Sequence, residues 1–204
     1  MLLICLIGGF GYACAKIAAK YSIPLVRVEV SEIDSADSLP ITTLEADDDE
    51  VTRSQFEDDN IQIIWKCNGQ RFYFVLLNKT EERMTVDWDK IVYIDTEGMT
   101  GNVIHNGINY NRRNEGQLKS ILPKSSKISD FLVPSENCFN NGFGWNETFL
   151  FPCVYKNKKE MWEKANSYIG SQMRLEMPLL IGDKEVTYTF YFELKELLQK
   201  KKKK

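Results

Sequence analysis

The sequence predicts an antiparallel β-sandwich that carries one short helix. From Ile61 onward, strand-like runs follow one another at spacings of roughly 8–12 residues, separated by Gly, Asn and Pro residues. Only Lys158–Gly170 has the apolar spacing of an amphipathic helix. A parallel sheet needs a crossover, usually a helix, between successive strands, so these two observations favour antiparallel neighbours.

Asn68 and Gly69 predict the first hairpin of this domain. They separate the β-rich runs Ile61–Cys67 and Arg71–Leu77, and Asn-Gly tolerates the positive φ angles that a type I′ turn requires. The strands expected next are Met84–Trp88, Ile91–Ile94 and Asn102–His105. A second hairpin is expected at the end of the domain, where a turn around Gly182 separates Met173–Met177 from Val186–Phe192.

The first nineteen residues are predicted to be a targeting or anchoring segment and not part of the folded domain. Met1–Ala15 contains no charge, and an apolar run of this length fits the core of a secretory signal better than a membrane-spanning helix. The triplet Ala13-Cys14-Ala15 leaves three outcomes open: cleavage after Ala15, lipidation at Cys14, or retention of residues 1–19 as a short anchor. Cleavage and lipidation both predict export, and a buried N-terminal helix or strand is the remaining alternative, which Gly8, Gly9 and Gly11 weaken.

Residues 20–60 are expected to form an acidic linker. From Glu29 to Asp59 there are twelve acidic residues against the single basic residue Arg53, a composition typical of a solvated tether. Within it, Val26–Val30 alternates and is a candidate first strand. The sandwich is then expected over residues 61–195, followed by a Lys-rich tail at 196–204.

Charge and histidine content exclude several classes of function. The net charge is −3, and five of the 26 basic residues are the lysines of the tail, which argues against a nucleic-acid partner. The chain has one histidine, His105. A single histidine excludes most zinc sites, and it excludes every Ser-His-Asp triad that does not use His105. The sequence therefore predicts no metal, no cofactor and no enzyme activity.

Three cysteines follow the N-terminal segment: Cys67, Cys138 and Cys153. Their spacing is not Cys-x-x-Cys, so zinc and thioredoxin-type sites are disfavoured. In an oxidising compartment Cys138 and Cys153 are the nearest pair in sequence. A disulfide between them and three separate buried thiols both remain open.

Two groups of residues are candidates for chemistry. Asp87 and Asp89 flank Trp88, and in a strand both carboxylates would lie on one face, as a carboxylate-dependent hydrolase requires. Ordinary alternation, with Trp88 in the core and both carboxylates in solvent, is the favoured interpretation. For His105 we favour a strand-end histidine hydrogen-bonded to a neighbouring strand or loop over a general base.

The best candidate for a contact surface is a pair of long loops. Trp145 lies among Asn and Gly residues, a composition that suits surface recognition, whereas Trp65 and Trp88 occupy core-like positions. Tyr110 and Arg112 lie in the other long loop. We expect Tyr110, Arg112 and Trp145 to contact an unidentified protein or glycan partner.

Several ordered pieces of the chain resemble a group of uncharacterised bacterial lipoproteins. The pieces include Leu77–Thr80, Val86–Asp89, Val103–Tyr110, Ile121–Asp130 and the hairpin Leu175–Phe192. The resemblance covers about Ile61 to Glu193 and implies an immunoglobulin-like sandwich and a location in the cell envelope, membrane-anchored or periplasmic. It transfers no catalytic motif. We therefore expect a non-enzymatic binding or structural lipoprotein, with an envelope hydrolase that uses Asp87 and Asp89 as the alternative and an inhibitor or adhesion module as a third class.

Overall fold

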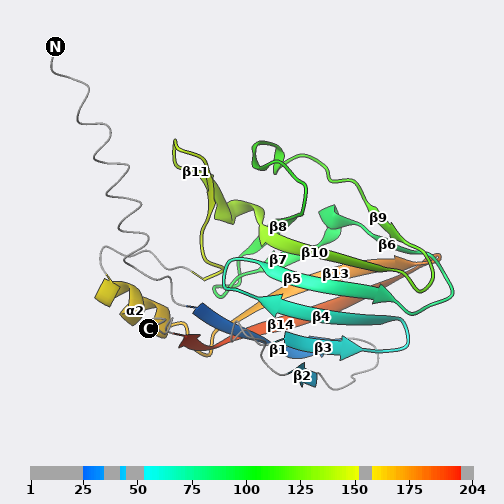
Figure 1. The fold of residues 1–204 in the computed structure, drawn as a ribbon, viewed down its shortest axis with the longest axis horizontal. Coiled ribbons are helices and arrows are strands. Elements are labelled where there is room, and N and C mark those ends of the chain that lie inside the picture. Colours follow the sequence, from blue (N-terminus) through cyan, green and yellow to red (C-terminus); the bar gives the residue numbers. More distant parts are fainter. Residues whose placement is uncertain (1–24, 35–41, 45–52, 152–157, 199–204) are drawn as a thin grey trace, which may run out of the picture.

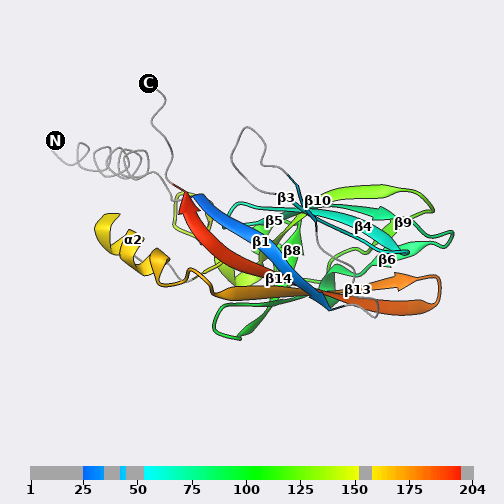
Figure 2. The same cartoon turned by 90° about the horizontal axis from the view of Figure 1, so that it is seen from below.

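A computed structural model describes residues 25–34, 42–44, 53–151 and 158–198, which form an antiparallel β-sandwich with one short helix. Figure 2 shows its two layers edge-on, and Figure 1 looks onto them. We name each layer by its central strand. The β5 layer contains β2 (Thr42–Leu44), β3 (Arg53–Glu57), β4 (Ile61–Cys67), β5 (Phe72–Asn78) and β10 (Lys127–Pro134). The β13 layer contains β1 (Leu25–Asp34), β6 (Met84–Val86), β7 (Val92–Ile94), β9 (Ser120–Leu122), β13 (Gln172–Ile181) and β14 (Lys184–Leu198).

Strand β8 (Thr100–His105) joins the two layers. Its first three residues pair with β7, and its last three, Val103–His105, pair with β10. The path β1-β14-β13-β7-β8-β10-β5-β4-β3-β2 is therefore continuous in its hydrogen bonding. A separate two-stranded sheet, β11 (Cys138–Asn140) and β12 (Trp145–Glu147), lies outside this path.

Both hairpins predicted from the sequence are present, but the first is not closed by a type I′ turn: Cys67 pairs with Phe72 across four residues, of which only Gly69 has a positive φ. In the turn between β4 and β5 the side chain of Asn68 accepts from the backbone N–H groups of Gln70 and Arg71, and Gly69 has a φ of +85°. In the turn between β13 and β14, Ile181 pairs with Lys184, which leaves a two-residue loop with Gly182 at a φ of +58°. Gly supplies these left-handed angles without steric cost.

A layer of aromatic rings fills the space between the sheets. The ring of Trp65 on β4 lies 5.2 Å from that of Phe74 on β5 and, across the core, 5.0 and 5.3 Å from the rings of Phe190 and Phe192 on β14. Trp65 is only 2% exposed. The residues of β4 and β5 alternate strictly between buried and half-buried, so one face of each strand points to this layer.

The segment expected as a linker contributes three strands. Strand β1 pairs with β14 along almost its whole length, and β3 pairs with β4, where Phe56 is buried against Tyr188 and Phe190. The sandwich therefore begins before residue 61, because backbone pairing along these strands outweighs their acidic composition. Residues 1–24, including Cys14, lie outside the described residues, as do Lys200–Lys204; β14 itself extends to Leu198.

Two local predictions need correction. Residues 84–88 do not form one strand: β6 ends at Val86 and Trp88 opens a short 3-10 helix, η1 (Trp88–Lys90), which buries the indole completely. The helix α2 runs from Lys158 to Asn166 and gives way to turns before Gly170, whose φ is +86°. Trp88 and Ala165 are buried as predicted, whereas Ile169, predicted to share the apolar face of the helix, lies beyond its end and is 45% exposed.

We predict that Trp65→Ala lowers the free energy of unfolding by about 3–5 kcal/mol, because it opens a cavity between the two layers. Ile64→Ala, on the half-buried outer face of the same strand, is the control and is expected to cost about 1 kcal/mol. Urea unfolding of both variants measures the difference. A larger loss for Ile64→Ala would show that the inner and outer faces of β4 have been assigned the wrong way round.

Candidate functional site

The structure brings the two predicted contact loops together. Tyr110 lies in the 3-10 helix η2 (Tyr110–Arg112) of the β8–β9 loop, and Trp145 begins β12. Their rings meet edge to face with centroids 5.8 Å apart. Figure 1 shows the β8–β9 loop and the β11–β12 hairpin rising from the same side of the sandwich. We call this region the two-loop surface: residues 106–119 together with residues 138–147.

A small second core lies beneath the two-loop surface. Ile104 of β8, Val133 of β10 and Cys138 of β11 are buried together, and Tyr110 and Trp145 pack against them. The hairpin also continues the backbone bonding of the sandwich, since the N–H of Leu150 donates to the carbonyl of Gly69 at 2.9 Å. Apolar burial therefore holds both loops against the outer side of the sheet.

The most specific contact in this region is an ion pair between Arg71 and Glu147. Arg71 Nη2 donates to Glu147 Oε1 at 2.5 Å, and Arg71 Nε donates to Oε2 at 2.7 Å, which is a bidentate arrangement. The hydroxyl of Tyr110 donates to the same Oε1, and the guanidinium lies 4.3 Å above the ring of Phe131. The Glu147 side chain is only 9% exposed. The turn after β4, the η2 loop and β12 thus meet at one carboxylate.

Arg71, Tyr110 and Cys138 are each held in one protonation state near neutral pH. The hydrogen bonds to Glu147 raise the pKa of Arg71 above its usual range, so the guanidinium stays charged. Burial, and then the hydrogen bond to Glu147, raise the pKa of Tyr110, so its hydroxyl keeps its proton and stays a donor. Burial raises the pKa of the Cys138 thiol to about 11. These groups are suited to holding a structure in place at neutral pH rather than to exchanging protons.

Arg113, rather than Arg112, contacts the aromatic pair. The guanidinium carbon of Arg113 lies 5.2 Å from the centre of the Trp145 ring, and Arg113 Nη1 donates to the carbonyl of Tyr110. Arg112 is exposed and forms an ion pair with Glu115 at 2.6 Å. Of the three residues predicted for contact, Tyr110 and Trp145 touch each other, whereas Arg112 lies on the solvent side of the η2 loop.

The tip of the β11–β12 hairpin presents an exposed ring that sequence analysis did not single out. Phe143 is 90% exposed and stands between Gly142 and Gly144, whose φ angles are +87° and +153°. Phe139, on β11, is 42% exposed. The signal in the sequence was the aromatic residue between two glycines. Arg71 and Glu147 were also missed, because residues 76 positions apart share no local pattern.

His105 ends β8 and is hydrogen-bonded to a neighbouring strand, as predicted. Its Nδ1 lies 3.1 Å from Asp130 Oδ2 on the neighbouring strand β10, and its ring stacks on Trp88 with centroids 4.2 Å apart. The other oxygen of Asp130 accepts from the backbone N–H groups of Asn106 and Phe131. Both partners of the histidine thus belong to the framework, as expected for a strand-end histidine.

Asp87 and Asp89 do not share the face of a strand. Asp87 precedes η1 and forms an ion pair with Lys119 at 2.8 Å. Asp89, within η1, accepts from the backbone N–H and the side-chain amide of Gln117. The physical reason is the 3-10 turn at Trp88, which ends the alternation on which the prediction depended. Each carboxylate has a separate structural partner.

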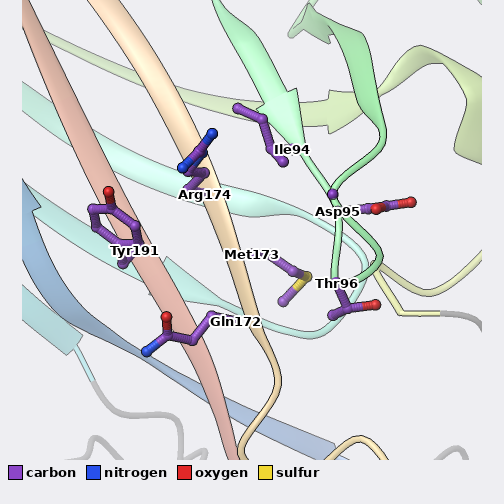
Figure 3. Close-up of a pocket in the computed structure, with 8 residues that line it drawn as sticks. Ile94, Asp95, Thr96, Gln172, Met173, Arg174 and Tyr191 are labelled. Carbon is purple, nitrogen blue, oxygen red and sulfur yellow. The ribbon is translucent and has the colours of Figure 1, made fainter.

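The described surface includes a hollow at the η2 loop and another beside the β7–β8 turn. One, of about 240 Å³, is lined by Asp89 together with residues of the η2 loop, including Arg113, Glu115 and Gln117; Asp87 does not line it. The other, of about 290 Å³, lies beside the β7–β8 turn and is shown in Figure 3. There Asp95 and Thr96 point away from Arg174 and Tyr191, so the polar groups of this hollow do not converge.

No group of three or more His, Cys, Asp or Glu side chains that could hold a metal ion occurs in the part of the chain that the structure describes. Cys67 and Cys138 are free, buried thiols, and Cys153 falls outside the described residues. Among the described helices, none is long and apolar enough to cross a membrane.

Comparison of the chain with protein-family models, with curated proteins and with solved structures finds no match.

We predict that Arg71→Met lowers the free energy of unfolding by about 1–3 kcal/mol, since it leaves the carboxylate of Glu147 buried without its cation. The double variant Arg71→Met, Glu147→Leu should recover much of that loss, because it removes the unpaired charge as well. Urea unfolding measures both.

The matched control is Arg112→Met, which breaks an exposed pair and should change stability by less than about 0.5 kcal/mol. Equal losses for Arg71→Met and Arg112→Met would contradict a structural role for the buried pair.

Proposed function

We propose that this chain is a non-enzymatic binding or structural protein of the bacterial cell envelope, and that it acts through the two-loop surface. The observation that carries the proposal is the contact between Tyr110 and Trp145, which joins two loops from distant parts of the sequence. Two irregular loops do not converge in this way without a specific set of contacts. The buried Arg71–Glu147 pair and the second core supply that set.

The composition of the two-loop surface supports recognition. Tyr, Trp, Phe and Arg are the residue types enriched where proteins bind partners, and Lys is depleted there. Residues 106–119 and 138–147 contain all four enriched types and one lysine, Lys119, which pairs with Asp87. Because the loops are held in place before any partner arrives, little conformational entropy is lost on binding.

The hydrolase alternative has less support. A pair of catalytic carboxylates must face one cleft at a separation that fits a glycosidic bond and its water or nucleophile. Asp89 lines the hollow of the η2 loop, but Asp87 is engaged by Lys119 outside that lining. No observation favours a reaction at this pair, so binding is the function that we propose.

The envelope location rests on the sequence. The uncharged run Met1–Ala15 and the Ala13-Cys14 junction support export followed by lipidation at Cys14. A single lipid chain gives only marginal membrane binding, whereas the acyl groups of a bacterial lipoprotein give stable anchoring.

We predict that a photo-crosslinking amino acid at position 143 or 112 gives discrete adducts in living cells, because both positions are exposed parts of the two-loop surface. The same amino acid at position 180 is the control, since Leu180 is 39% exposed at the far end of β13. The measurement is the mass of each adduct after purification. Absence of adducts from 143 and 112, or equal adducts from 180, would contradict a binding role for this surface.

We predict that the protein extracted from membranes carries a diacylglyceryl group on Cys14. Intact-mass measurement of the extracted protein detects this group. The variant Cys14→Ser should lose that mass and move to the soluble fraction. A mass that corresponds to cleavage after Ala15, or to an uncut N-terminus, would contradict lipidation at Cys14.

A further inference from the structure

We propose that the tip of the β11–β12 hairpin, residues Phe139–Asn146, docks on a lipid surface and inserts the ring of Phe143 at its boundary. The inference rests on the proposed function, because it names the partner of the same two-loop surface. It goes beyond that proposal, since it gives the folded domain a membrane contact that is separate from any N-terminal anchor.

The first argument is the exposure of Phe143 on a stiff turn. At 90% exposure its ring projects from the end of a hairpin instead of lying in a flat patch. The turn closes with a hydrogen bond from the N–H of Asn141 to the carbonyl of Gly144. The left-handed φ angles of Gly142 and Gly144 fix the direction of the chain on both sides of the ring. A single protruding ring fits a fluid apolar boundary, which needs no matching pocket.

The second argument is that the backbone N–H groups of Asn141, Gly142 and Phe143 are hydrogen-bonded within the turn. The side chain of Asn140 accepts from the N–H of Gly142 at 2.8 Å, and that of Asn141 accepts from the N–H of Phe143 at 3.0 Å. The side-chain amide of Asn146 donates to the carbonyl of Gly144 at 3.1 Å. Backbone groups left unpaired would oppose transfer out of water. The tip can therefore leave water without exposing these N–H groups to lipid.

The third argument is the distribution of charge. Phe139–Asn146 contains no charged residue, and the carboxylate that follows it, Glu147, is already buried against Arg71. No ion has to lose its hydration when the tip docks. Behind the tip, Arg112 and Lys119 pair with Glu115 and Asp87, whereas Arg113 lies over the Trp145 ring and forms no ion pair among the described residues. A cation beside an aromatic tip favours the anionic headgroups of a bacterial membrane.

The energetics of one ring are sufficient when the chain is tethered. Burial of a phenylalanine side chain shifts the ratio of docked to free tip by about tenfold or more. This is too little to recruit a freely diffusing protein. A chain anchored in the same membrane, however, holds its tip at an effective concentration on the order of millimolar, so a weak contact becomes a populated one.

The test uses the full chain, anchored in vesicles of phosphatidylethanolamine and phosphatidylglycerol. Phe143→Trp places a tryptophan fluorophore at the tip. Its fluorescence is the emission of the variant minus the emission of the unsubstituted protein. We expect this added emission to shift to shorter wavelength and to be quenched by vesicles whose acyl chains carry bromine. Leu180→Trp, at the opposite end of the sandwich, is the matched control and should show neither effect.

Quenching of the Phe143→Trp emission that exceeds the control supports docking. Equal quenching at the two positions, or none at either, overturns it. The crosslinking experiment separates the two proposals. Adducts of position 143 with a protein, without quenching, leave the binding function intact and exclude the lipid surface as its partner. If position 143 gives no adducts and its emission is not quenched, both proposals are wrong.

Discussion

The packing of Trp65 against Phe190 and Phe192 is the constraint on which the rest of the structure depends. It joins the β5 layer to the β13 layer, and side chains in a strand alternate between faces, so it also fixes which residues point outward. A slip of one residue would reverse every side chain of the strand. With Phe72 buried inside the sandwich, Arg71 must lie on the outer side, where it meets Glu147. The geometry of the two-loop surface is thus set by the core.

The β8–β9 loop is ordered by side chains that act in place of a strand. The amide of Gln117 donates to the carbonyl of Val103 and accepts from the N–H of His105, the pair of bonds that a neighbouring strand would make to β8. Asp89 holds the backbone N–H of Gln117 in turn. The loop is therefore closed at its base while η2 remains outside, which explains how a segment with little regular structure presents Tyr110 in one place.

The parts of the fold that the sequence predicted are those with local physical causes. The Asn68-Gly69 turn and the alternation of β4 and β5 each depend on residues within a few positions of one another. Strand β3 was not predicted, since Phe56 alone marks its inner face and pairing with β4 supplies the remaining stabilisation. Asp87 and Asp89 were placed on one face because the pattern does not reveal that Trp88 is buried through a 3-10 turn.

Some contacts of the two-loop surface involve residues that local sequence composition marks out, and others depend on the folded path of the chain. The sequence therefore predicted residues of this surface but not its geometry. Tyr110 and Trp145 were recognisable by residue type and loop composition, whereas the Arg71–Glu147 pair depends on the folded path of the chain. Apolar burial in the second core draws the hairpin toward the sheet but has no direction of its own. A buried ion pair adds little net stability, because desolvation offsets its attraction. The bidentate geometry of the Arg71–Glu147 pair instead restricts the orientation of the hairpin relative to the sheet. We infer that Arg71 and Glu147 chiefly determine where the tip of the hairpin points.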